Sequence, residues 1–384
     1  MINVNNHKNT FYAIMAFSLI QLIIYFTNRS QIFYITAEDF SAIYKILFIC
    51  LYQLGFVIGS LFNQFFINKF GINGTYIVLF AFSTISLLFN ILYQSNWSWL
   101  FFRFIYSFSI AGLYWIFNDH FSVSNKNIRQ NISFSVAKLT IVRFANIISN
   151  ILISILSFQY DKMVVISVIL MQVAQIFFSL NNKNNLALAK PINDLKFYLD
   201  IYTEFYQKNK SFCIFFLVLL GIHNTYITWL IIMASNLHLD LAWSKILIVV
   251  FALGEILSTY IFKFLGYTNI HKKLYWGYIS FGIINFFMFL IIYFQKYFLL
   301  VPILFIAGVI GAKMIASLEL LVFQNQKITN RINFDFSNTL IKHLLNMSLI
   351  IITYPFTSSK IYIIFFILSI FFTSFSFINK PSIL

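Results

Sequence analysis

The sequence predicts an all-α membrane protein whose twelve transmembrane helices form two pseudo-symmetric bundles of six. Three observations predict this fold: the composition, the spacing of the apolar segments, and a similarity between the two halves of the chain. Of 384 residues, 60% are apolar, 20% are aromatic and only 10% are charged. Soluble domains are about 45–50% apolar and about 25% charged. The composition therefore excludes a soluble enzyme, a disordered chain and a disulfide-rich scaffold.

The apolar segments are long enough to cross a bilayer, which takes about 20 residues. In chain order they cover residues 10–33, 43–67, 75–94, 97–118, 134–157, 163–180, 211–234, 243–264, 274–295, 298–323, 343–357 and 360–378. A polar stretch separates the sixth segment from the seventh. The chain is thereby divided into an N-terminal bundle (1–180), a cytoplasmic linker (181–210) and a C-terminal bundle (211–384).

The linker contains a helical pattern of its own. Its apolar and aromatic residues recur at steps of three and four, and charged residues occupy the other side: Leu195, Tyr198, Leu199, Tyr202, Phe205 and Tyr206 against Lys196, Asp200, Glu204 and Lys208. This pattern predicts an amphipathic helix that lies at the inner surface of the membrane and connects the two bundles.

The two bundles also resemble each other in sequence. Two glycine motifs recur after almost the same number of residues: Gly59 and Gly71 match Gly254 and Gly266 at an offset of 195, and Ile110-Ala111-Gly112 matches Ile306-Ala307-Gly308 at 196. A repeat of six-helix units in the same direction along the chain is the sequence mark of one large transporter architecture.

The net charge of +15 gives the expected orientation. With both termini in the cytoplasm, 16 Lys and Arg residues fall in cytoplasmic segments and 6, including Arg29, in outer ones. Because cytoplasmic loops carry the excess of cations, we expect a multi-pass protein of a bacterial inner or plasma membrane. The cations are dispersed among short loops, so a nucleic-acid partner is not expected. Cys50 and Cys213 lie apart in apolar segments, and we expect no metal and no cofactor.

Two motifs carry a resemblance to a known family. Residues 59–71 begin with Gly59-Ser-Leu and end with Lys69-Phe-Gly71, and residues 103–112 place Arg103 before Ile110-Ala111-Gly112. Both are similar to motifs of the major facilitator superfamily, in the loop after the second span and in the fourth span. The resemblance implies the fold of this superfamily, transport by alternating access, and a gating role for Gly59, Lys69 and Gly71.

Charged residues at membrane depth indicate where function resides, because each costs at least about 2.5–3.5 kcal/mol to insert. The deep candidates are Arg103, Arg143, Glu255, Lys313 and Glu319. Cations outnumber acids among them, and a guanidinium binds carboxylate or phosphate with two hydrogen bonds, so an anionic substrate is favoured. Glu255 and Glu319 are the candidates for proton coupling, and a structural ion pair with Lys313 or Arg143 is the alternative for both.

Amide and aromatic side chains complete the expected substrate site. Arg143 belongs to a polar stripe along the fifth span with Thr140, Asn146, Asn150 and Ser154, which fits either an aqueous path or interhelical hydrogen bonds. The first span has a similar stripe, with Ser18, Gln21, Tyr25 and Asn28, and the seventh has His223 and Asn224 near Gly221.

Together these features predict a secondary active transporter for a small anionic solute, working by alternating access, with proton symport as an option. We expect a monomer whose partners are that solute and the lipid bilayer. Enzyme motifs such as a P-loop are absent from the sequence, and we expect no enzymatic activity. The alternative is a flippase or an enzyme that handles lipid-linked glycans.

Overall fold

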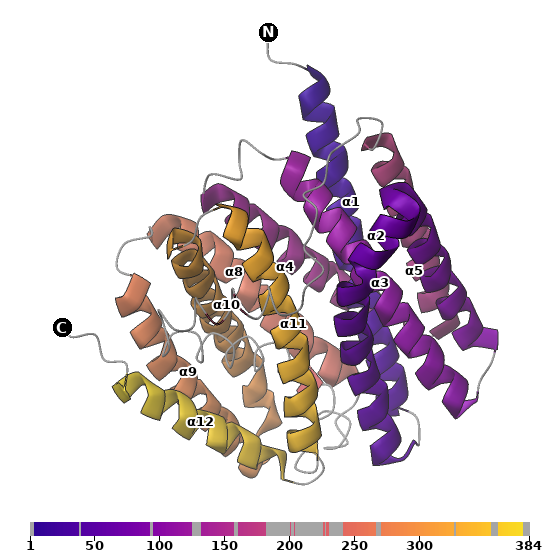
Figure 1. The fold of residues 1–384 in the computed structure, drawn as a ribbon. Coiled ribbons are helices and arrows are strands. Elements are labelled where there is room, and N and C mark those ends of the chain that lie inside the picture. The colour runs from indigo at the N-terminus through magenta and orange to yellow at the C-terminus, as the bar shows by residue number, and fades with distance from the viewer. Residues whose placement is uncertain are drawn as a thin grey trace.

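The computed structural model describes residues 4–37, 40–92, 95–124, 132–156, 160–181, 200, 203, 226, 228, 229, 241–265, 270–325, 328–354 and 360–378. Almost all of these are helical (Figure 1). The helices are α1 (Val4–Ala37), α2 (Ala42–Leu92), α3 (Asn96–Ser124), α4 (Ile132–Ile155), α5 (Tyr160–Asn181), α8 (Leu241–Leu265), α9 (Ile270–Tyr293), α10 (Leu300–Asn325), α11 (Ile328–Thr353) and α12 (Ile361–Ile378), with the 3-10 turn η1 (Tyr297–Leu299) before α10.

The helices follow the predicted apolar segments in order, which confirms the helical fold for the described residues. Six of these helices are long and apolar enough to cross a membrane, and four more contain shorter apolar stretches. Most of the linker, 181–210, and of the seventh segment, 211–234, lies outside the described residues. The count of twelve spans and the amphipathic linker helix therefore stay predictions.

Helix α2 combines the second and third predicted segments. Its 51 residues would measure about 75 Å if straight, more than twice the roughly 30 Å of a bilayer core. Gly71 interrupts it with φ of 67° and ψ of 173°, a conformation that glycine adopts without the steric cost that a side chain would bring. The sequence motif thus ends where the chain leaves the helical path, as predicted.

Helix α11 begins earlier than predicted. The apolar segment was placed at 343–357, whereas the helix runs from Ile328 to Thr353. The first turns are rich in Asn, Asp and Arg, so hydropathy alone underestimates the helix. The correction moves His343 from the end of a span to the middle of a helix.

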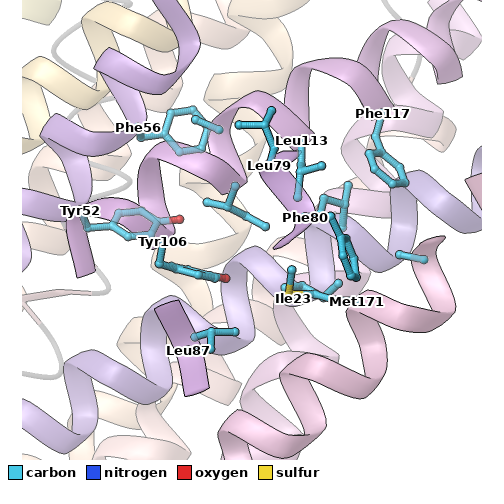
Figure 2. Packing of buried hydrophobic residues seen from close by; sticks show 14 of the residues in the cluster. Ile23, Tyr52, Phe56, Leu79, Phe80, Leu87, Tyr106, Leu113, Phe117 and Met171 are labelled. Carbon is cyan, nitrogen blue, oxygen red and sulfur yellow. The ribbon is translucent and has the colours of Figure 1, made fainter. Parts of the chain in front are cut away.

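The helices gather into two groups, with α1, α2, α3 and α5 on one side of the molecule, α8–α12 on the other, and α4 between them (Figure 1). Each group has its own apolar core. In the N-terminal half, α1, α2, α3 and α5 enclose side chains such as Ile23, Leu79 and Met171 (Figure 2). In the C-terminal half, α8, α9, α10 and α12 enclose Phe251, Met288 and Phe372, among others.

The two halves meet at two main contacts. One contact joins α4 to α8 and α10, and the other joins α2 to α11. A third apolar cluster draws side chains from both halves and is defined here as the interhalf cluster: Phe26, Ile32, Ile49, Cys50, Ile153, Met163, Ile248 and Ile350. It comes from the C-terminal thirds of α1, α4 and α11 and the N-terminal thirds of α2, α5 and α8, which the predicted orientation places toward the outer side of the membrane.

Close glycine contacts repeat in the two halves. A Cβ on Gly59 of α2 would lie 2.1 Å from the Phe108 carbonyl oxygen of α3. In the C-terminal half, a Cβ on Gly254 of α8 would lie 2.2 Å from the Phe305 carbonyl oxygen of α10. Both glycines therefore let two backbones approach closer than any side chain would permit. The sequence repeat corresponds to a repeated helix-packing contact.

Candidate functional site

The polar stripe on α4 lies where the two halves meet. Arg143, Asn146 and Asn150 recur at steps of three and four, so they share one face of the helix. All three side chains are buried. The face is turned toward α1 on one side and toward α8 and α10 on the other. The stripe predicted from the sequence is therefore central to the molecule, and its side chains hydrogen-bond between helices.

Arg29 of α1 makes the largest number of the hydrogen bonds at this stripe. Its guanidinium donates to the Asn150 side-chain oxygen at 2.6 Å, to the Asn146 backbone carbonyl at 3.2 Å and to the Ser149 hydroxyl at 3.4 Å. The ring of Tyr25, one turn earlier on α1, lies 5.2 Å from the guanidinium carbon. Arg29 is buried and held by amides, a hydroxyl and an aromatic ring.

The C-terminal half contributes a carboxyl group and a carbonyl. Asn146 donates its side-chain N–H to Glu255 of α8 at 2.9 Å. Arg143 donates to the backbone carbonyl of Ala312 in α10 at 3.1 Å. Glu255 is buried and interacts electrostatically with Arg29 and with Tyr25. Charges from opposite halves thus meet around the α4 stripe, and we call this contact the α4–α8 interface.

Several buried polar atoms at this interface have no hydrogen-bond partner among the described residues. They are Gln21 Nε2, Asn146 Oδ1, Asn150 Nδ2 and Ser258 Oγ. Gln21 precedes Tyr25 by four residues and Arg29 by eight, and Ser258 follows Glu255 by three, so each lies on the face that carries the charged group. Buried polar groups in proteins are usually paired, so each of these four atoms has hydrogen-bonding capacity that a ligand or a water molecule can use.

The second contact between the halves, the α2–α11 interface, has different chemistry. The His343 ring nitrogen Nδ1 of α11 shares a hydrogen bond with the side-chain oxygen of Gln53 in α2. The same imidazole stacks on Phe56, with 4.1 Å between ring centroids. Both His343 and Gln53 are buried.

Arg103 lies within the N-terminal half. It donates to the side-chain oxygens of Asn28 and Gln31 on α1. Its guanidinium also lies between the rings of Phe48 and Tyr52 on α2, at 4.6 and 4.5 Å from their centroids. Two residues predicted for the substrate site, Asn28 and Arg103, therefore bind each other and join three helices of one half.

The remaining predicted site residues divide into those that the structure places and those that it does not describe. Lys313 is half-buried in α10, directly after Ala312. Lys69 is exposed near Gly71, with its ammonium 5.4 Å from the Phe70 ring centroid. His223 and Asn224, and the side chain of Glu319, lie outside the described residues.

Two residues at the contacts between the halves, Arg29 and His343, are not among the site residues predicted from the sequence. Arg29 was counted with the outer loops, but the structure places it in a continuous helix of 34 residues, with its side chain buried. A signal was present, because Gln21, Tyr25 and Arg29 follow one another at steps of four. The predicted span begins at His343, which places this residue at a helix terminus. The signal for a buried position was its spacing of three from Asn346, since two polar residues at that spacing share one helix face and both are buried.

Comparison with known proteins rests on structure alone, since no family model and no curated protein matches the sequence. A variant of the nucleoside transporter NupG superimposes with a TM-score of 0.63 at 13% identity, covering 99% of this chain and 100% of that one. The POT family transporter PepTSo gives 0.66 at 13% identity, over 97% and 96% of the two chains. Both neighbours have the architecture of the major facilitator superfamily. This chain has the major facilitator fold.

The major facilitator fold accounts for the position of the α4 stripe. Two bundles related by an axis along the membrane normal place their facing helices around the centre of the molecule. The residues there that carry charge come from both halves, Arg29 and Arg143 from one and Glu255 from the other. The identity of 13% means that the likeness concerns the fold.

Proposed function

We propose that this chain is a secondary transporter that carries a small solute with an anionic group across an inner or plasma membrane. The solute binds at the α4–α8 interface, and access alternates as the two halves move. The observation that carries the proposal is the buried network of Arg29, Arg143, Asn146, Asn150 and Glu255, built from both halves. The transporter function of the structural neighbours, NupG and PepTSo, supports it.

The charge of the network favours an anionic group. The hydrogen bonds described bring two guanidiniums, those of Arg29 and Arg143, and one carboxyl, that of Glu255, to the same buried interface. Guanidinium groups bind carboxylate and phosphate in a planar geometry with paired hydrogen bonds. Since ligand pockets are mostly apolar with a few polar groups that fix orientation, these few charges are the ones that select the solute.

Alternating access follows from how the halves are joined. The hydrogen bonds from Asn146 to Glu255 and from Arg143 to Ala312 connect side chains to the opposite half. Hydrogen bonds between polar groups are exchanged at modest net free energy when water or a solute replaces the partner. The interhalf cluster, by contrast, is apolar and joins the two halves. The solute shifts the population between two arrangements of the halves.

Uptake into proteoliposomes tests the function. Purified full-length protein would be given labelled metabolites, anions and cations alike, with and without a pH gradient. We expect uptake of at least one anion-bearing solute above empty liposomes. Uptake of cations but not of anions would contradict the proposal.

Proton coupling at Glu255 has its own test. With the solute found above, the substitution Glu255→Gln is expected to remove the effect of the pH gradient on uptake, because the amide cannot bind and release a proton. Asp161→Asn is the matched control, since Asp161 is exposed at the start of α5. An unchanged pH effect in Glu255→Gln would remove Glu255 from the coupling mechanism.

A further inference from the structure

The polar atoms around Asn146 separate into a donor side and an acceptor side. The two ends of each amide are assigned by their partners, since a guanidinium only donates and a carboxylate only accepts. Asn150 accepts from Arg29 through its oxygen, which leaves its Nδ2 donor unpartnered. Asn146 donates to Glu255 through its nitrogen, which leaves its Oδ1 acceptor unpartnered.

The donor side gathers around Arg29. Its unpartnered donors are Asn150 Nδ2 and Gln21 Nε2, and both side chains are buried. Gln21 lies two turns before Arg29 on the same face of α1. A guanidinium with the Asn150 amide donor beside it, and the Gln21 amide donor two turns away on the same face, suits a carboxylate, which accepts up to about four hydrogen bonds on its two oxygens.

The acceptor side gathers around Glu255. Asn146 Oδ1 is unpartnered on the side chain that donates to Glu255, and Ser258 Oγ is unpartnered one turn farther along α8. Both side chains are buried. A carboxylate, an amide oxygen and a hydroxyl oxygen together suit a protonated amine, which has three donors and no acceptor.

The donor side and the acceptor side both contact the same residue, Asn146. The Asn146 backbone carbonyl accepts from Arg29, and the Asn146 side chain donates to Glu255. A ligand that reaches both sides is therefore small, with its anionic and cationic groups close together. We propose that the solute of this site is a zwitterion, such as an amino acid, whose carboxylate binds at Arg29 and whose ammonium binds at Glu255. The inference rests on the proposed function.

Selectivity follows from the cost of unpaired buried groups. A carboxylate without an amine leaves the acceptor side unsatisfied, and each buried polar group without a partner is disfavoured. Sites built to hydrogen-bond a particular group reject analogues that lack it much more strongly than apolar pockets reject a missing methylene. The ammonium also competes with a proton for Glu255, so solute binding and protonation at this carboxyl are linked.

Thermal stabilisation of the purified full-length protein tests the inference with two matched panels. One contains the standard amino acids, and the other contains the same carboxylates without the amino group. We expect at least one amino acid to stabilise the protein with at least about tenfold higher apparent affinity than its deaminated partner, as expected when a charged hydrogen bond is lost. Glu255→Gln is expected to bring the amino acid down to the level of the deaminated acid, and Asp161→Asn is expected to change neither.

The possible results separate the inference from the proposed function. Deaminated acids that stabilise the protein as well as the amino acids, or an equal loss of both in Glu255→Gln, would overturn the zwitterion and leave an anion transporter. No stabilisation by either panel would also overturn the zwitterion. The proposed function itself fails only if no anion-bearing solute enters the proteoliposomes.

Discussion

The two contacts between the halves differ in what they leave unsatisfied. At the α4–α8 interface, charged groups from both halves bind through amides, and four buried polar atoms have no partner among the described residues. At the α2–α11 interface, one histidine shares a hydrogen bond with Gln53 and stacks on Phe56. The first contact has the capacity to bind a ligand, whereas the described polar groups of the second are paired with each other.

This difference indicates that the two interfaces have different roles. A network with unpartnered donors and acceptors gains hydrogen bonds when a ligand enters, whereas a contact whose described groups are paired gains none. Solute recognition therefore belongs to the α4–α8 interface, and the α2–α11 interface holds the halves together. Substitutions at the two interfaces should affect transport and stability in different proportions.

The largest effect is expected for Arg143→Ala. Truncating one partner of a buried, hydrogen-bonded charged contact with a ligand costs about 2–5 kcal/mol of binding free energy, so we expect uptake to fall by roughly 100-fold or more. Uptake into proteoliposomes measures it, with gel filtration to verify folded protein. The matched control is Lys138→Ala. Lys138 is half-buried and lies five residues before Arg143 on the same helix. Full uptake in Arg143→Ala would remove Arg143 from the site.

Arg29→Ala is expected to come next, because it removes the guanidinium proposed to bind the solute carboxylate but leaves the hydrogen bond from Arg143 to the other half in place. We expect uptake to fall by about 10- to 100-fold. Arg29→Lys keeps the charge but loses the planar set of donors, so it should restore only part of the uptake. Full activity in the lysine variant would show that charge alone matters at this position.

At the α2–α11 interface, His343→Phe keeps an aromatic ring against Phe56 but removes the hydrogen bond to Gln53. Leaving the buried Gln53 oxygen unpaired is expected to lower stability by about 1–3 kcal/mol, measured as a shift in thermal unfolding. Uptake, corrected for folded protein, should fall far less than in Arg143→Ala. If His343→Phe lost as much uptake as Arg143→Ala while its stability was unchanged, the α2–α11 interface would have a direct role in transport, which contradicts the roles assigned here.

The smallest effect concerns the interhalf cluster. Cys50 is buried in it together with Ile350 from the other half. In a Cys213→Ser background, a membrane-impermeant maleimide should label Cys50 slowly, and Ile350→Ser should speed the labelling several-fold, since a polar group weakens the apolar contact. Ile351→Ser is the matched control, because Ile351 is 51% exposed. Equal rates in both variants would mean that Ile350 does not cover Cys50.

The fold was predictable from the sequence to the extent that it depends on local spacing. Apolar runs gave the order of the helices, and the glycine motifs gave the close contacts at Gly59 and Gly254. Hydropathy failed where polar residues continue a helix, as in the first turns of α11. Hydropathy failed there because a helix forms through backbone hydrogen bonds and the helix propensity of its residues, and neither requires apolar side chains.

The site was predictable only in part. The α4 stripe and Glu255 were singled out because charges in an apolar helix are costly and therefore informative. Arg29 was assigned to a loop by a rule that counts cations near span ends, and His343 was placed at a span terminus. Neither rule includes contacts between helices that are distant in the sequence, and such contacts decide that both side chains are buried.

The sequence by itself determined that this chain is built of long apolar helices and that one of them carries a polar stripe, since both features depend on neighbours three or four residues apart. It also determined the repeated glycine motifs, because they recur at a nearly constant offset along the chain. Only the tertiary structure decided that Asn28 binds Arg103 within one half while Arg29, the next residue, turns to the α4 stripe. Consecutive residues on a helix point about 100° apart. Which helix lies in each direction depends on the packing of the whole bundle.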